Sequence, residues 1–232
     1  MDLEFLQAVV QFDTGLLLRN LPFSHAQLRQ DLFVLAVLGF PKAGYFVEFG
    51  AADGIRFSNT YLLEKQFGWT GVLAEPAKVW SQALRTNRSC HIDSRCVWSE
   101  SGKHMSFLEA PEAELSTLEE FKSVDGHSDT RESGRVYSVE TISLEDLLDH
   151  YSAPKVIDYL SIDTEGSELP ILESLDFNKY QFKVITCEHN LTPAREDIRQ
   201  LLESRGYRRV FTEVSRWDDW YVMSQIPRAH AR

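Results

Sequence analysis

The sequence predicts an α/β fold in which an open, mostly parallel sheet carries helices on both faces. From residue 44 onward, short apolar segments alternate with segments of helical character, and this alternation is typical of parallel sheets built from strand–helix–strand units. Two of the apolar segments, residues 45–49 and 72–74, are followed at once by a glycine-bracketed loop and by a carboxylate. Ligands bind beyond the carboxyl ends of the strands in such sheets, so these ends are the first place to seek a site.

Residues 1–43 are expected to form a helical cover that precedes the sheet domain, residues 44–232, in one compact unit. Leucine and valine recur at about helical spacing in the first half of the cover. Ser24 is expected to cap a further helix that ends at Gly39. The cover is expected to lie over an edge of the sheet or over the mouth of the ligand site.

The elements of the sheet domain follow in order along the chain. Strands are expected at residues 45–49, 72–74, 90–98, 156–162 and 183–187, and a final antiparallel pair at 210–214 and 220–223. Helices are expected between them, at about 60–67, 77–88, 144–151 and 193–205. The third of these helices has the clearest beginning, because Ser143 can cap it and two acidic residues follow in its first turn.

Residues 100–135 differ from the rest of the chain because they are rich in Glu and Asp and contain scattered glycines. A short hairpin arm is expected at 103–108, followed by a mobile acidic loop. Such a loop is either a disordered surface excursion or a lid over the substrate.

The composition narrows the class of protein. The chain has 232 residues and a net charge of -11, which disfavours binding to nucleic acid because that binding depends on Lys and Arg at phosphates. No apolar run reaches the roughly 18 residues of a membrane span, and the acidic start of the chain differs from a secretory signal. We therefore expect a cytoplasmic protein with no membrane span; whether it forms a homo-oligomer stays open.

The loop after the first strand indicates a nucleoside cofactor. Gly50 and Gly54 follow Glu48 with three residues between the glycines, which differs from the G-x-G-x-x-G pattern of pyrophosphate-binding loops. This spacing argues for S-adenosylmethionine, which has no phosphate and carries a positive sulfonium. The glycines would let the backbone approach the amino-acid part of the cofactor, and Glu75 would accept hydrogen bonds from both ribose hydroxyls.

Two motifs resemble those of the FkbM family of S-adenosylmethionine-dependent methyltransferases. They are Glu48-x-Gly50-Ala51-x-x-Gly54 and Ile162-Asp163-Thr164-Glu165-Gly166-Ser167-Glu168, the second directly after an apolar strand. Residues 68–76 are also typical of the family. The resemblance spans about 44–222 and implies a Rossmann-like class I methyltransferase fold with a seven-stranded sheet. It also implies O-methylation of a small-molecule or glycan acceptor, such as a sugar, a polyketide or another small metabolite.

The candidates for cofactor binding lie at or after the carboxyl ends of the first four strands. They are Glu48, Gly50, Ala51, Asp53, Gly54, Asn59, Glu75, Pro76, Cys96, Val97 and Asp163. Two roles stay open for several of them. Asp53 would meet the cofactor ammonium or only cap its own turn, whereas Cys96 and Val97 would border the adenine or pack in the core.

The catalytic candidates are Asp163, Glu165 and His189. Asp163 would lie beside the transferring methyl group and favour the sulfonium electrostatically, and either Glu165 or His189 would remove the acceptor proton. A metal site is an alternative, because Asp163, Glu188 and Asn190 would offer the oxygen ligands that suit Mg²⁺. Such an ion would lower the pKa of the acceptor oxygen.

Two other interpretations stay open. Ala52 stands where many relatives have Asn, and Ser161 where many have Lys, so a methyltransferase-fold binding or scaffold protein without catalysis is an alternative. An NAD-dependent oxidoreductase is disfavoured by the missing G-x-G-x-x-G pattern. Near the end of the chain, Trp217 and Trp220 would form a sugar-stacking wall or pack in the core.

Overall fold

The computed structural model describes residues 2–225, and within them a seven-stranded sheet has the order β10-β11-β9-β8-β1-β2-β3. The parallel strands are β1 (Tyr45–Phe49), β2 (Thr70–Ala74), β3 (His91–Asp93), β8 (Val156–Ile162) and β9 (Gln181–Glu188). The antiparallel pair is β10 (Tyr207–Val210) and β11 (Asp218–Met223), and β11 pairs with β9. This mostly parallel, seven-stranded sheet with helices on both faces confirms the predicted Rossmann-like fold class.

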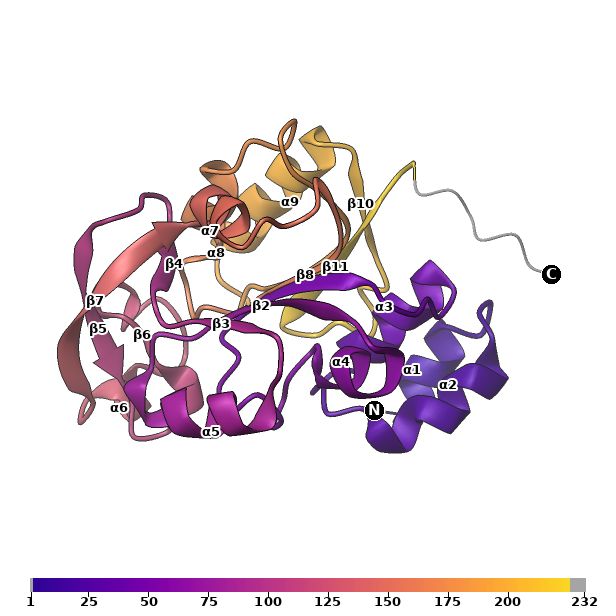
Figure 1. Cartoon of the computed structure of the whole chain (residues 1–232), viewed down its shortest axis with the longest axis horizontal. Coiled ribbons are helices and arrows are strands. Elements are labelled where there is room, and N and C mark those ends of the chain that lie inside the picture. Colours follow the sequence, from indigo (N-terminus) through magenta and orange to yellow (C-terminus); the bar gives the residue numbers. More distant parts are fainter. Residues whose placement is uncertain (1, 226–232) are drawn as a thin grey trace.

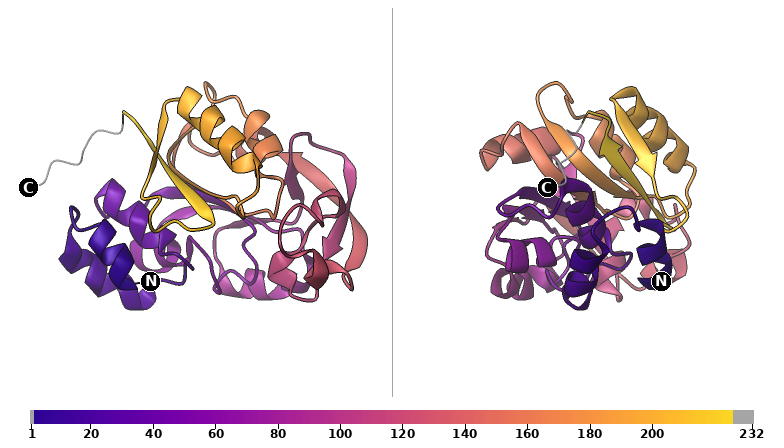
Figure 2. Two further views of the ribbon diagram at one scale, coloured as in Figure 1. Left: turned by 180° about the vertical axis from the view of Figure 1, so that it is seen from behind. Right: turned by 90° about the vertical axis from the view of Figure 1, so that its right-hand side faces the viewer.

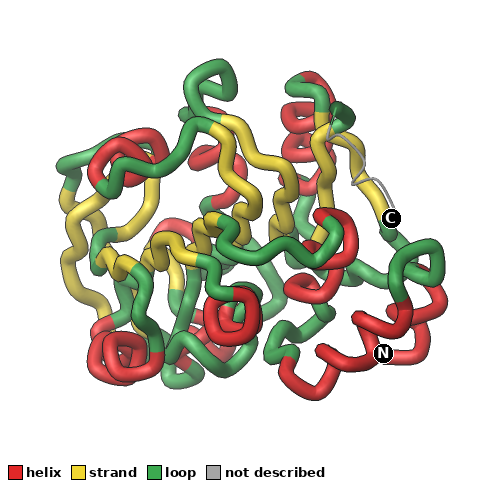
Figure 3. The backbone as a smooth tube through the Cα atoms, turned by 45° about the vertical axis from the view of Figure 1, so that its right-hand side comes forward, coloured by secondary structure: helices red, strands yellow, loops and turns green. Residues whose placement is uncertain are grey.

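Helices cover both faces of this sheet (Figures 1 and 3). The helices on one face are α7 (Leu144–His150), α8 (Glu168–Glu173) and α9 (Ala194–Ser204). Those on the other are α1 (Asp2–Ala8), α2 (Thr14–Asn20), α3 (Gln30–Leu38), α4 (Tyr61–Phe67) and α5 (Ser81–Asn87). Because each face has its own buried apolar cluster, the central strands are buried on both sides, as their continuous apolar runs predict.

The amino-terminal helices pack on a face of the sheet instead of along its edge. Phe33 of α3 stacks on Trp220 of β11, with ring centroids 4.6 Å apart. Gln30 donates from Nε2 to the buried carboxylate of Asp218 at 2.6 Å. This apolar and polar contact joins the cover to the strand next to β9, and it places Trp220 in the core.

Two predicted details of the chain are wrong for local reasons. Ser24 does not cap α3, because the helix begins after Arg29, which has a left-handed φ of +67°, and the Ser24 hydroxyl donates to Asp31 instead. The strand predicted at 210–214 is β10, which ends at Val210 because Phe211 is left-handed at φ +56° and begins a turn.

A second sheet of order β4-β7-β5-β6 adjoins the first and was predicted only in part. The expected strand 90–98 is divided: β3 stays in the main sheet, and β4 (Cys96–Trp98) pairs with the unpredicted β7 (Arg135–Ser143). Segment 100–135 is not a plain loop, since it contains β5 (His104–Glu109), β6 (Thr117–Leu118), α6 (Ser128–Arg131) and two 3₁₀ turns.

The second sheet and the amino-terminal helices lie at opposite ends of the molecule (Figures 1 and 2). The main sheet connects them, and its strand ends face the second sheet near β4 and β6. Among the described residues, no helix has both the length and the apolar character needed to span a bilayer.

Candidate active site

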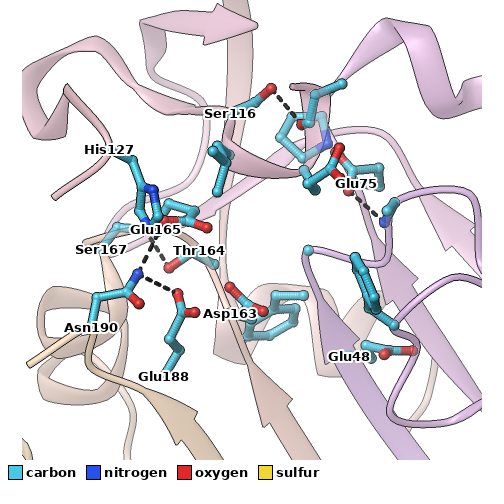
Figure 4. Close-up of a pocket in the computed structure, with 18 of the residues that line it drawn as sticks. Glu48, Glu75, Ser116, His127, Asp163, Thr164, Glu165, Ser167, Glu188 and Asn190 are labelled. Atoms are coloured by element: carbon cyan, nitrogen blue, oxygen red, sulfur yellow. Dashed lines mark hydrogen bonds between the residues drawn. The ribbon is translucent and has the colours of Figure 1, made fainter. Parts of the chain in front are cut away.

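The carboxyl ends of β1, β2, β8 and β9 open into a cavity of about 470 Å³. This volume lies in the range of small-molecule sites, about 300–1,000 Å³. β1 is the topological switch point of the sheet, since β2 lies on one side of it and β8 on the other. In open α/β sheets, ligands bind in the crevice at such a point. Glu75 and Asp163, the two residues on which the sequence prediction depends most, both line this cavity (Figure 4).

Glu48 holds the loop that follows β1. Its carboxylate accepts hydrogen bonds from the backbone N–H of Asn59 at 2.7 Å and from the hydroxyls of Ser58 and Thr60. The buried guanidinium of Arg88 lies 3.6 Å away. Glu48 also lines the cavity. Because donors from the loop occupy most of its carboxylate lone pairs, Glu48 mainly fixes the conformation of the loop.

The two loop glycines are required by contacts between protein segments. Gly50 has φ +74°, and a Cβ there would lie 2.0 Å from the carbonyl oxygen of Asp163. Gly54 has φ +81°, and a Cβ there would lie 2.6 Å from Cγ of Arg88. Gly50 lines the cavity and Gly54 does not.

Two other predicted cofactor residues also lie outside the cavity lining. Asp53 accepts hydrogen bonds at Oδ1 from the backbone N–H groups of Ile55 and Arg56, both at 2.8 Å. It therefore caps its own turn, which is the second of the two roles predicted for it. Ala51 is buried in the apolar cluster beneath the amino-terminal helices.

Glu75 lies at the end of β2 with each carboxylate oxygen on a backbone N–H. Oε2 accepts from Ala52 at 2.9 Å and Oε1 from Ala77 at 2.8 Å, and each oxygen keeps a second lone pair for a ligand. Burial raises the pKa of Glu75 to about 7, and the charges of Asp163 and Glu109 add to the rise. Near neutral pH this carboxyl is close to half ionised.

An apolar wall adjoins Glu75. Cys96 and Val97 of β4 belong to it, together with Phe107 of β5 and Leu118 of β6. The last two were not predicted, because they come from the segment that the sequence presents as an acidic loop. An apolar surface beside a buried carboxyl group suits a ligand that has both an apolar and a polar part, as a nucleoside does.

Three carboxyl groups gather in another part of the cavity, away from Glu75 (Figure 4). Oxygen atoms of Asp163, Glu165 and Glu188 lie within 4.8 Å of one another. Asp163 and Glu188 are close enough for each to shift the pKa of the other. Adjacent parallel strands bring them together, since Asp163 directly follows β8 and Glu188 ends β9.

Asn190 completes this cluster as a hydrogen-bond donor. Its Nδ2 donates to Glu165 at 3.1 Å and to Glu188 at 2.9 Å. The expected Mg²⁺ site needs Asn190 as an oxygen ligand, whereas here its amide nitrogen faces the carboxylates. The arrangement therefore does not support the predicted set of Mg²⁺ ligands.

Arg131, which ends α6, reaches the same cluster and was missed by the sequence analysis. Its side chain is buried, with Nη2 donating to Glu165 at 2.9 Å and a two-point contact to Asp125 at 2.7 and 3.0 Å. Nε donates to the carbonyl of Leu115 at 2.7 Å. One guanidinium therefore ties segment 110–134 to the acidic cluster, and no local sequence pattern marks it.

Burial raises the pKa of all three clustered carboxyls. The pKa of Asp163 rises to about 6 and that of Glu165 to about 9, where Asp163 adds to the effect of burial. Burial also raises the pKa of Glu188 well above its usual value. Arg131 alone cannot balance these groups, so the cluster retains protons near neutral pH and favours a positively charged ligand.

His189 does not face the cluster, and this argues against its predicted role as a base. It is buried outside the cavity lining. Its Nδ1 accepts from the backbone N–H of Leu191 at 3.0 Å, and its Nε2 lies 3.8 Å from Asp219. Burial lowers the pKa of His189. Its hydrogen bond from Leu191 holds the turn after β9.

The mouth of the cavity combines apolar side chains with one ion pair. Phe57, Leu191 and Trp217 line it, which favours the wall-forming role for Trp217. Arg56 and Glu114, from opposite segments, pair at 3.0 Å.

Backbone strain is concentrated around this cavity. Among its described lining residues, five that are not glycine have a left-handed φ between +44° and +62°: Ala52, Phe57, Glu165, Asn190 and Leu191. Such conformations cost about 1–3 kcal/mol each and cluster at functional sites.

The fold and the cavity define the class of protein, a Rossmann-like α/β protein with a cavity at the carboxyl ends of its parallel strands. The model of the FkbM methyltransferase domain matches residues 48–209. The chain therefore belongs to the FkbM methyltransferase family, and membership implies S-adenosylmethionine as the methyl donor.

The chain is also similar to solved structures at low sequence identity. The FkbM methyltransferase from Methylobacillus flagellatus is 14% identical, with a TM-score of 0.47 over 78% of this chain. The METTL16 methyltransferase domain is 12% identical, with a TM-score of 0.46 over 84% of this chain. The precorrin-6y C5,15-methyltransferase from Geobacter metallireducens is 12% identical, with a TM-score of 0.41 over 77% of this chain and 72% of its own.

This chain spans 43% of the Methylobacillus protein and 66% of the METTL16 domain. No curated protein sequence matches it.

Proposed function

We propose that this protein transfers a methyl group from S-adenosylmethionine to a hydroxyl oxygen of a small-molecule or glycan acceptor. The observation that carries the proposal is that one cavity contains both Glu75 and the cluster of Asp163, Glu165 and Glu188. Glu75 suits ribose hydroxyls, and the cluster suits a sulfonium. Family membership supports the same donor.

Asn59 gives an independent reason to expect a ligand with a hydrogen-bond donor. It lines the cavity and is 8% exposed. Its Nδ2 donates to the hydroxyl of Ser161 at 2.9 Å, whereas its buried Oδ1 has no hydrogen-bond partner among the described residues. A buried amide oxygen without a donor is costly, and the ammonium of the cofactor would supply that donor.

When bound, the cofactor supplies the methyl group: the acceptor oxygen bonds to the methyl carbon as the carbon–sulfur bond breaks, and the electron pair stays on sulfur. The protein's task is then to position the acceptor and to take its hydroxyl proton. We assign proton removal to Glu165. Arg131 and Asn190 both donate to its Oε2, which orients the carboxylate and leaves Oε1 for the acceptor.

Asp163 would lie nearest the sulfonium, because it follows β8 directly and its backbone packs against Gly50. A positive ligand beside the cluster lowers the pKa values of its carboxyls. Binding of the donor would therefore ionise Glu165 in the complex that needs a base.

Calorimetry with S-adenosylmethionine and S-adenosylhomocysteine is the first test, and the absence of binding at high micromolar concentration would reject the proposal. Glu165→Gln and Asp163→Asn should abolish turnover and leave the affinity for S-adenosylhomocysteine within about tenfold.

Cell extract incubated with the protein and isotope-labelled donor, followed by mass spectrometry, would identify the acceptor. Cofactor binding without any labelled product would favour the scaffold interpretation. EDTA and Mg²⁺ added to the same assay test the metal alternative, because only metal-dependent transfer would respond.

A further inference from the structure

The charges around the cavity restrict the acceptor. Six carboxyl residues line it: Glu48, Glu75, Glu114, Asp163, Glu165 and Glu188. Among the described lining residues, Arg56 is the only Lys or Arg, and Glu114 already pairs with it at 3.0 Å. A phosphate or carboxylate entering here would meet no unpaired guanidinium or ammonium group among these lining residues. It would also oppose ionisation of the carboxyls, and each one that is ionised would repel it, which costs several kcal/mol in general.

The mouth of the cavity has exposed apolar side chains, whereas carboxyl groups gather inside the cavity. Phe57 is 39% exposed and Leu191 is 73% exposed, although both are large apolar side chains. They lie on different loops, after β1 and after β9, and both line the cavity. Exposed apolar side chains at the rim of a polar pocket are typical of a ligand contact.

The protein holds both side chains in place at a conformational cost. Phe57 has φ +62° and Leu191 has φ +58°, and a left-handed backbone disfavours residues with a side chain by about 1–2 kcal/mol. The backbone of Phe57 forms a bridge with Ala26. Leu191 donates its N–H to the buried His189. A contact therefore holds the backbone of each residue and sets where its side chain begins.

We propose that this mouth selects hydroxyl acceptors that are neutral or cationic and carry an apolar flank, with Phe57 and Leu191 as the residues that contact the flank. The inference rests on the proposed methyl transfer, because it assigns the acceptor to the same cavity. The flank would lie at the rim, and the hydroxyl would point inward to Glu165.

Binding to the protein saturated with S-adenosylhomocysteine tests this selection. The first set of probes is phenyl β-glucoside, which is neutral and has an apolar flank, phenyl β-glucuronide, which is carboxylated, and glucose, which has no flank. The second set is a linear diol in the same three forms: with an alkyl substituent, with a carboxylate and unsubstituted. In at least one set, the neutral flanked compound should bind at least tenfold more tightly than its carboxylated and unsubstituted counterparts.

Preference for a carboxylated or unsubstituted probe would overturn the inference. So would binding of S-adenosylhomocysteine with no binding of any probe, and the proposed function would then still stand. Failure of S-adenosylhomocysteine itself to bind would instead reject the proposed function.

Matched variants locate the contact. Asn tolerates a left-handed backbone, so Phe57→Asn and Leu191→Asn should keep the fold while removing the apolar surface. Each should weaken the neutral flanked probe at least fivefold and leave S-adenosylhomocysteine unaffected. Leu18→Asn is the control, since Leu18 is 51% exposed on α2 and outside the cavity lining. Variants that match this control would overturn the inference.

A third variant tests the charge selection. Glu114→Gln removes the ion-pair partner of Arg56, whose guanidinium keeps its contact with the ring of Phe57 at 4.6 Å, so the affinity for phenyl β-glucuronide should rise at least threefold. An unchanged affinity would overturn the claim that pairing of Arg56 excludes anions.

Discussion

The acidic and apolar parts of the cavity are built by different kinds of contact. The acidic part lies at the ends of β8 and β9, which are neighbours in the parallel sheet. The apolar part uses β4, β5 and β6 of the second sheet, and Arg131 joins the adjoining segment to the acidic cluster. Sheet topology alone therefore places the first part, whereas the second depends on long-range packing around one buried cation.

The largest expected effect comes from breaking the link between these parts. Arg131→Met would leave Asp125 without its two-point partner in a buried position, and removing one member of a buried ion pair costs about 3–5 kcal/mol. We expect the free energy of unfolding, measured with urea at pH 7, to fall by about that amount.

The control for this change is Arg135→Met, at the exposed start of β7. A surface substitution of this kind should change stability by no more than about 0.5 kcal/mol. If the two variants unfold alike, the segment does not depend on the guanidinium.

The next effect concerns the contact between β1 and β8. Gly50→Ala would place a Cβ 2.0 Å from the carbonyl of Asp163, whereas a Cβ at Gly68 would meet nothing within 4 Å. Both glycines are left-handed, so both variants carry about 1–2 kcal/mol of conformational strain. Gly50→Ala should lose about 1–3 kcal/mol more because of overpacking, and it alone should lose affinity for S-adenosylhomocysteine. Equal losses in urea unfolding would contradict the close approach.

The smallest effect is a pH dependence that sharpens the role of Glu75. Its pKa of about 7 in the folded protein means that ribose meets a protonated carboxyl below neutral pH. Affinity for S-adenosylhomocysteine should therefore rise about tenfold from pH 6 to pH 8, and Glu75→Gln should remove this dependence. Calorimetry across that range measures it, and equal slopes for both proteins would refute the role.

The raised pKa of Glu75 also makes the stability of the unliganded protein depend on pH, in the direction opposite to the cofactor affinity. The folded pKa of Glu75 lies above its ordinary value of 4.5, so its contribution to stability is present at low pH. That contribution is lost as pH rises from about 4.5 through 7. The unfolding free energy of the unliganded protein should therefore decline over this interval more steeply than that of Glu75→Gln.

Sequence reasoning reached the parts of the molecule that local patterns determine. The strand at 156–162 and the Ser143 cap were predicted with their observed positions. The common cavity of Glu75 and Asp163 also followed from strand ends. β7 was missed because its role in the second sheet depends on pairing with β5, far from it in sequence. The direction of His189 was missed because it depends on left-handed residues 190 and 191, which their side-chain types do not reveal.

The left-handed residues at the cavity mouth link the stability of the protein to the proposed selection of the acceptor. Glycine at position 57 or 191 would relieve the left-handed backbone, and it would stabilise the folded protein wherever that relief exceeds the extra entropy that glycine loses on folding. The same substitutions would remove the two side chains that stand at the entrance. A variant with glycine at both positions should therefore be less selective among acceptors.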